Sequence, residues 1–248
     1  MRNLICGFIF VVLLGSSGAP AQTEQNAEAQ TLLERLDHTM FPTTYEMGLS
    51  MTTHRPGQDD LYYKFDVVGS GVDKSLMTMT DPARERGKQI LMNGDNLWLY
   101  IPDVSRPVKL TKRDRFMGST FSNDDVMSST LADKYNAAIL SRQIVSGHDY
   151  VTLDLEAKSR DVSYAKLVAV VDSASAIPDT ITYYGLAGEP IKYMVTGDVR
   201  HLAGRLRPTL MTMYDNLEKG AYTSVNVLSL EAKKNVPESM FDPTRLGK

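Results

Sequence analysis

Thr44-Tyr45-Glu46-Met47-Gly48-Leu49-Ser50-Met51-Thr52 alternates between apolar side chains and small or polar ones, and this stretch decides the fold. Successive side chains of a β-strand point to opposite faces, so a period of two residues indicates a strand with one buried face. Arg55-Pro56-Gly57 interrupts the run, and Leu61 to Val67 then repeats the alternation. The pattern predicts two half-buried antiparallel strands joined by a turn.

Further strands are expected along most of the chain. Asn93-Gly94 predicts a hairpin, because both residues tolerate positive φ, and Leu97 to Ile101 would be its returning strand. Similar short segments follow from Ile139 to Glu231. The predicted sheet has about eleven strands, with boundaries uncertain by about 2–4 residues.

Two helices are expected to accompany this sheet. Between Glu28 and Phe41 the apolar residues Leu32, Leu33, Leu36 and Met40 share one helical face, and Pro42 would end the helix. In the middle of the chain, Ser122 can cap a short helix whose first turn carries Asp124 and Asp125. The predicted fold class is mainly β (α+β), a curved antiparallel half-barrel with short helices as a lid over an apolar cavity.

The first residues have the layout of a secretory signal. Arg2 precedes an apolar run from Leu4 to Leu14, and Ala19-Pro20-Ala21 forms a small-residue cleavage site before Gln22. Cys6 lies within the apolar run, whereas a lipid-modified cysteine would follow it. A lipid anchor is therefore not expected. We predict cleavage near Ala21, with residues 1–21 as the signal and residues 22–248 as a single domain.

The composition excludes several classes of protein. The formal net charge is −3 at pH 7, whereas a nucleic-acid binder would show a strongly basic face. The single cysteine would leave with the signal, so neither a disulfide nor a cysteine-bound metal is expected. His38, His54, His148 and His201 lack a second ligand at a spacing typical of zinc sites. No metal and no cofactor is therefore predicted.

Methionines and aromatic residues dominate the positions expected to face inward. Thioether side chains adapt to irregular contents, which suits a pocket for variable acyl chains, although ordinary core packing explains any single methionine equally well. The candidate cavity-lining residues are Met47, Leu49, Met51, Tyr63, Phe65, Met77, Met79, Trp98, Tyr100, Met211 and Met213.

A basic stretch lies between Arg84 and Arg115, where cations outnumber acids in a chain that is acidic overall. Lys112, Arg113 and Arg115 could form a docking patch for lipid head groups or for an acidic partner surface. Scattered, solvated charges at strand edges are the alternative explanation, since such charges also prevent aggregation.

The segment Gly94-Asp95-Asn96-Leu97-Trp98-Leu99-Tyr100-Ile101-Pro102 resembles the outer-membrane lipoprotein-sorting protein family, that is, LolA/LolB-like periplasmic proteins. The resemblance continues through Arg115 to Asp125, the Met211-Thr212-Met213 strand and the ending Val236 to Phe241. It implies a half-barrel with a helical lid over a hydrophobic cavity that holds acyl chains. It also implies a periplasmic location and work with an inner-membrane transporter and an outer-membrane acceptor.

We therefore expect a periplasmic carrier that binds acyl chains of lipoproteins or envelope lipids and delivers them toward the outer membrane. The alternative is a non-transporting lipid sensor or a scaffold for an envelope transporter. Catalysis is not expected: no Gly-x-Ser-x-Gly motif is present, and the adjacent Asp124 and Asp125 would not face each other on a helix. An envelope hydrolase remains the least favoured alternative.

Overall fold

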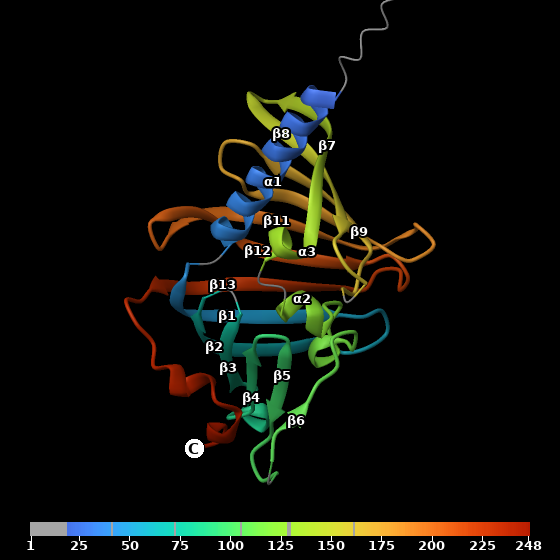
Figure 1. Ribbon diagram of the computed structural model, residues 1–248. Coiled ribbons are helices and arrows are strands. Elements are labelled where there is room, and N and C mark those ends of the chain that lie inside the picture. The colour runs from blue at the N-terminus through green and yellow to red at the C-terminus, as the bar shows by residue number, and fades with distance from the viewer. Residues whose placement is uncertain (1–18, 41, 72, 105, 128–129, 161) are drawn as a thin grey trace, which may run out of the picture.

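A single antiparallel sheet organises the chain in the computed structural model, which describes residues 19–40, 42–71, 73–104, 106–127, 130–160 and 162–248. Its strand order is β6-β5-β4-β3-β2-β1-β13-β12-β11-β10-β9-β8-β7, so among the described strands only β1 and β13 pair although they are distant in the sequence. The sheet is open, with β6 and β7 as its edges. The predicted mainly β fold with one large antiparallel sheet is confirmed (Figure 1).

The strands number 13 among the described residues, against the eleven or so expected. They are β1 (Thr44–His54), β2 (Leu61–Ser70), β3 (Lys74–Asp81), β4 (Gln89–Asn93), β5 (Asn96–Tyr100), β6 (Val108–Lys109), β7 (Tyr135–Val145), β8 (His148–Ala157), β9 (Lys166–Asp172), β10 (Pro178–Tyr184), β11 (Pro190–Leu202), β12 (Arg205–Asp215) and β13 (Tyr222–Ala232). Strand β6 has only two residues, too few to show any periodicity.

The predicted hairpin is present, but its turn lies one residue later than expected. Asn93 pairs with Asn96, which leaves Gly94 and Asp95 as the central residues of the turn. Gly94 has a φ of 55°, the left-handed region that favours glycine. The glycine therefore fixes the turn, and Asn93 is the last residue of β4.

Helix α1 (Ala19–Met40) is longer than predicted and lies over one half of the sheet (Figure 1). Leu32, Leu33 and Leu36 are buried, as the helical pattern predicted. Arg35 fixes the helix to the sheet by donating to the carbonyl oxygens of Ser173 and Ala174 at 3.0 and 2.7 Å. Two short helices, α2 (Asn123–Met127) and α3 (Leu131–Lys134), lie on the same side of the sheet.

The inner face of the sheet carries two apolar clusters. One joins α1 to strands β7–β12 around Leu33, Leu153 and Met213. The other joins β1–β5 around Phe65 and Ile90, with Phe116 of the 3₁₀ turn η2 (Phe116–Gly118) packed on it. The helical side of the sheet is thus divided between two packed regions with a seam between them.

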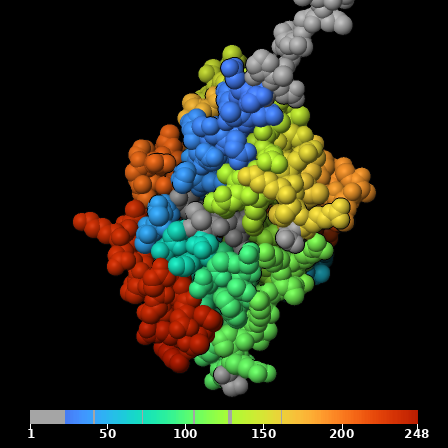
Figure 2. Space-filling model, viewed as in Figure 1, coloured from blue at the N-terminus to red at the C-terminus, as the bar shows by residue number. Residues whose placement is uncertain are grey.

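A third apolar cluster covers the outer face of β3–β5. The C-terminal 3₁₀ turns η3 (Glu238–Phe241) and η4 (Pro243–Arg245) place Phe241 and Leu246 against Leu91. Figure 2 shows these C-terminal residues, in red, beside the teal and green strands. Both faces of this part of the sheet are therefore buried.

The predicted signal segment lies outside the described residues up to residue 18, and residues 19–21 form the start of α1. The predicted helix end at Phe41 also lies outside them, whereas α1 ends at Met40. None of the helices in the described part of the chain combines the length and the apolar character required to cross a membrane.

Candidate functional site

A cavity of about 330 Å³ lies at the seam between the two inner clusters. Leu36, Leu167 and Ile181 line it from the first cluster, and Tyr45 and Val67 line it from the second. Ligand cavities typically measure about 300–1,000 Å³ and are mostly apolar. This cavity is therefore large enough for a small amphiphile.

The floor of the cavity is the inner face of strands β1, β2, β3, β12 and β13. Six predicted cavity residues lie there: Met47, Leu49, Met51, Phe65, Met77 and Met211. They come together because consecutive antiparallel strands place same-face residues side by side, as in the pairs Met47–Val67 and Leu49–Phe65. Val225 and Val227 of β13 complete this wall.

The other five predicted residues lie elsewhere. Tyr63 and Met79 are buried within the β1–β5 cluster, and Met213 is fully buried under α1. Trp98 and Tyr100 share a strand face, but it is the outer face, where they pack against the C-terminal turns. Leu97, next to Trp98, occupies the inner face instead.

The roof of the cavity is formed by the helices and carries carboxylates that the sequence-based interpretation did not assign to the site. Asp37 of α1 accepts hydrogen bonds from the backbone N–H groups of Leu131 and Ala132 at 3.0 and 2.9 Å. Its side chain thereby caps α3 and joins it to α1. Burial raises the pKa of Asp37 to about 6, although these two hydrogen bonds act in the opposite direction.

Asp125 of α2 also lines the cavity and forms a buried ion pair with Lys192 of β11. The ammonium group lies over the rings of Tyr164 and Tyr183, at 4.8 and 5.1 Å from their centroids. Such cation–π contacts stabilise a desolvated ammonium group. The pair therefore holds the short helix α2 onto the sheet.

The predicted cap of α2 is confirmed. Ser122 Oγ accepts a hydrogen bond from the N–H of Asp125 at 3.2 Å, and Asp125 Oδ2 accepts from the N–H of Ser122 at 2.6 Å. This reciprocal arrangement is a capping box. Asp125 thus both caps its own helix and pairs with Lys192, and only the first role was expected.

Asp124 is buried as well and belongs to the same roof. Its carboxylate accepts from the N–H of Ser163 at 3.1 Å and pairs with Lys134 at 3.4 Å. Both neighbouring carboxylates therefore have structural partners.

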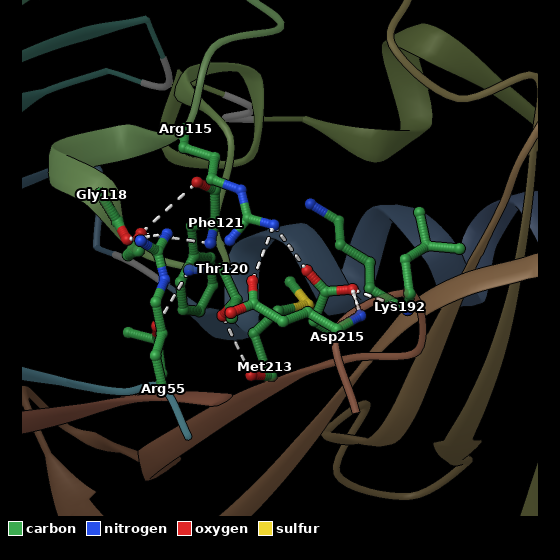
Figure 3. A network of polar contacts seen from close by, with 12 residues as sticks. Arg55, Arg115, Gly118, Thr120, Phe121, Lys192, Met213 and Asp215 are labelled. Carbon is green, nitrogen blue, oxygen red and sulfur yellow. Dashed lines mark hydrogen bonds and ion pairs between the residues drawn. The ribbon is translucent and has the colours of Figure 1, made fainter. Parts of the chain in front are cut away.

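The predicted docking patch of Lys112, Arg113 and Arg115 lies in the segment that leads to α2. Arg115 pairs with Asp215 at 2.9 Å and with Glu218 at 3.4 Å, and Lys112 pairs with Asp95 at 2.9 Å. Figure 3 shows the Arg115 side chain directed at Asp215. Arg113 is exposed. Two of the three cations thus have an acidic neighbour.

The same segment is held against the strands by hydrogen bonds to backbone carbonyl oxygens. Thr120 donates from its hydroxyl to the carbonyl oxygen of Met213 at 3.0 Å, and Arg55 donates to that of Gly118 at 2.6 Å (Figure 3). These contacts fix the approach to α2, and hence one side of the cavity roof.

The histidines do not gather at this site. His54 pairs with Asp60 at 2.8 Å and His148 with Asp172 at 2.9 Å, both at strand ends, whereas His38 lies at the cavity. Within the described ranges, no group of three or more His, Cys, Asp or Glu side chains is placed to hold a metal ion.

Comparison with known proteins identifies relatives of this fold. A LolA superfamily protein from Nitrosomonas europaea shares 26% identity, with a TM-score of 0.77 over 86% of this chain and 97% of that one. A DUF1329 family protein from Desulfovibrio piger shares 21% identity, with a TM-score of 0.81 over 90% and 99% of the two chains. A putative outer membrane lipoprotein-sorting protein domain from Vibrio parahaemolyticus shares 20% identity, with a TM-score of 0.78 over 89% and 99%.

No curated protein matches the chain. A family model described as "-like: Uncharacterized protein" matches residues 71–248, which is more than half of the sequence. The chain therefore belongs to the family that this model describes, and it has the fold of the LolA superfamily.

Proposed function

We propose that this protein is a periplasmic carrier that binds acyl chains of lipoproteins or envelope lipids in the cavity and delivers them toward the outer membrane. The observation that carries the proposal is the 330 Å³ apolar cavity at the seam between sheet and helices. Residues 1–21 would direct export, and residues 22–248 would form the binding domain. An inner-membrane transporter and an outer-membrane acceptor would be its partners.

Burial of apolar surface would supply the affinity. Each methylene group moved from water into the cavity contributes about 0.8 kcal/mol, so an acyl chain binds without a specific polar contact. The methionines of the floor suit this task, because unbranched thioether side chains adjust to chains of different length. No chemical step is required, and the protein acts by binding and release.

Release would require the roof to move away from the sheet. Asp37 ties α1 to α3, and the Asp125–Lys192 pair ties α2 to β11. Because Leu33 of α1 belongs to the first apolar cluster, opening at α2 would disturb the core less than movement of α1. The exposed Arg113, with Lys112 and Arg115, would bring the carrier to an anionic membrane surface.

A cavity-filling variant tests the carrier function. Val227 lies on the floor of the cavity and is only partly buried, so Val227→Trp should fill the space without displacing the core. We expect an acyl chain coupled through a neutral amide to an environment-sensitive fluorophore to bind the wild type and to lose at least about tenfold in affinity in this variant. Fluorescence titration measures the difference.

Val199→Trp is the matched control, because Val199 is 47% exposed on the opposite face of the sheet. It should bind the probe like the wild type. If neither the wild type nor this control bound the probe, the carrier function would be rejected. A stable complex with a membrane protein combined with an empty cavity would instead favour a scaffold.

A further inference from the structure

The two walls of the cavity differ in polarity. The floor is dominated by methionine, leucine, valine and phenylalanine side chains from the sheet, with Tyr45, Lys74 and Ser75 as its more polar members. The roof carries three carboxyl groups, Asp37 on α1 and Asp124 and Asp125 on α2. When the chain of a bound amphiphile contacts the floor, its polar end must be compatible with the acidic roof.

The cations that balance these carboxylates are set back from the cavity. Lys134 and Lys192 pair with Asp124 and Asp125, but neither lysine is among the residues that line the space. A ligand in the cavity therefore lies closer to the carboxylates than to the lysines that balance their charge.

One lysine does line the cavity, at the start of β3. Lys74 Nζ donates to both carboxylate oxygens of Glu238, at 3.0 and 2.9 Å. Its charge is therefore already compensated by an acidic group from the C-terminal segment. His38 contributes a further titratable side chain to the lining.

Three tyrosines beside the roof respond to the same charges. Burial raises the pKa of Tyr135, Tyr164 and Tyr183, and the negative charge of Asp125 raises each of them further. This end of the cavity disfavours additional negative charge.

We infer that the cavity selects amphiphiles whose polar end is neutral or cationic and donates hydrogen bonds, and that it discriminates against fatty-acid anions. The inference rests on the proposed function, because it concerns the chemical class of ligand that the same cavity takes. A carboxylate head group would have to lose its hydration beside Asp124 and Asp125 or take up a proton. A hydroxyl, amide or amine group can donate to these oxygens instead.

A matched ligand series tests this selection on the wild-type protein. Monodecanoylglycerol, decylamine and decanoate carry chains of equal carbon number with neutral, cationic and anionic polar ends. Each would be used at pH 7.5 to displace the neutral fluorescent acyl probe. We expect the glyceride and the amine to compete at least about tenfold better than decanoate. The affinity for decanoate should rise when the pH is lowered toward 5, whereas the affinity for the glyceride should not.

The outcomes separate the inference from the function on which it rests. If the probe and all three ligands failed to bind, the carrier function itself would be rejected. If all three ligands bound equally well, or if decanoate bound best, the carrier function would stand and the selection would be overturned.

Variants test whether the roof carboxylates cause the discrimination. Asp125→Asn combined with Lys192→Met replaces the buried ion pair by neutral side chains of similar size, which avoids an unpaired buried charge. The affinity for decanoate, relative to that for the glyceride, should rise at least about threefold in this variant and in Asp124→Asn. Asp95→Asn is the control, since Asp95 is an exposed residue outside the cavity lining. Unchanged discrimination in folded roof variants would overturn the assignment.

Discussion

Asp125 and Lys192 illustrate how a single ion pair can set the position of a short helix. The two side chains are 3% and 9% exposed, so neither charge can be solvated if its partner is removed. Asp125→Asn should therefore lower the free energy of unfolding by about 3–5 kcal/mol, because it leaves the Lys192 ammonium buried and unpaired. Urea denaturation followed by circular dichroism measures this loss.

The double variant Asp125→Asn/Lys192→Met provides the comparison. It should be more stable than Asp125→Asn alone, since no unpaired charge remains in the interior. Lys233→Met is the surface control: its pairs with Glu46 and Glu231 are exposed, and the loss should stay within about 0.5 kcal/mol. Equal losses in the single and the double variant would contradict this role of the pair.

Asp37 should make stability depend on pH in an unusual direction. Burial raises its pKa from 3.8 to about 6, so the folded state holds this proton more tightly than the unfolded chain does. The stabilisation from proton binding is complete below pH 3.8 and is lost as the pH rises through about 6. We expect the stability of the wild type relative to Asp37→Asn to fall by roughly 2–3 kcal/mol from pH 4 to pH 7.

Parallel urea titrations of the two proteins at several pH values isolate this contribution, because other titrating groups are common to both. A difference that stays constant with pH would show that Asp37 titrates at its ordinary value.

Arg113 is the cation through which the docking proposal is tested most cleanly. Arg115 and Lys112 have acidic neighbours, so their reversal would also disturb local ion pairs. Arg113→Glu should weaken binding to anionic vesicles roughly tenfold, since each cation near such a surface contributes about 1 kcal/mol. Vesicle co-sedimentation measures the change, with the exposed Arg205→Glu as control. Unchanged binding in Arg113→Glu would favour the alternative of scattered, solvated charges.

At this scale the sequence predicts which residues share a face but not always which face is the inner one. Trp98 and Tyr100 do lie on the same face of β5, as their spacing required, yet that face is the outer one. Apolar residues occupy both faces of β4 and β5, because the C-terminal turns cover the outer side. Where both faces are buried, a period of two cannot identify the cavity side.

Among the elements, the C-terminal turns η3 and η4 act as a cover for strands β3–β5. Phe241 is 1% exposed and packs with Leu91 and Trp98, and Asn93 Nδ2 donates to its carbonyl oxygen at 3.0 Å. Removal of a buried phenylalanine ring leaves a cavity, so Phe241→Ala should cost about 3–5 kcal/mol. Thermal or urea denaturation measures this cost.

Leu228→Ala serves as the control, because Leu228 is 59% exposed and its truncation should change stability by less than about 0.5 kcal/mol. Probe binding should survive in folded Phe241→Ala protein, since Phe241 does not line the cavity. A small loss of stability would mean that the C-terminal cover is dispensable to the sheet.

The helices differ in how far local sequence determines them. The apolar face of α1 and the cap at Ser122 follow from spacing and residue type, and both are present. The contacts that place these helices over the sheet link distant residues, such as Asp37 to Leu131 and Asp125 to Lys192. No local pattern encodes such pairs, so the acidic roof emerged only from the structure.

For the whole molecule, the order of strands explains why a cavity forms. Most strands pair with their neighbours in sequence, and the β1–β13 pair joins the two halves of the sheet at its centre. The helical layer packs closely on each half but leaves space where the halves meet. Alternation and turn residues were sufficient to predict the open antiparallel sheet, whereas the position and volume of the space depend on long-range packing.

The most direct test of the carrier function is native mass spectrometry of the protein purified from its own envelope, followed by organic extraction and identification of the bound lipid. We predict a bound acylated molecule, and the Val227→Trp variant purified in the same way should carry markedly less of it. A protein that is empty in both forms, and whose wild type fails to bind the neutral acyl probe, would contradict the account.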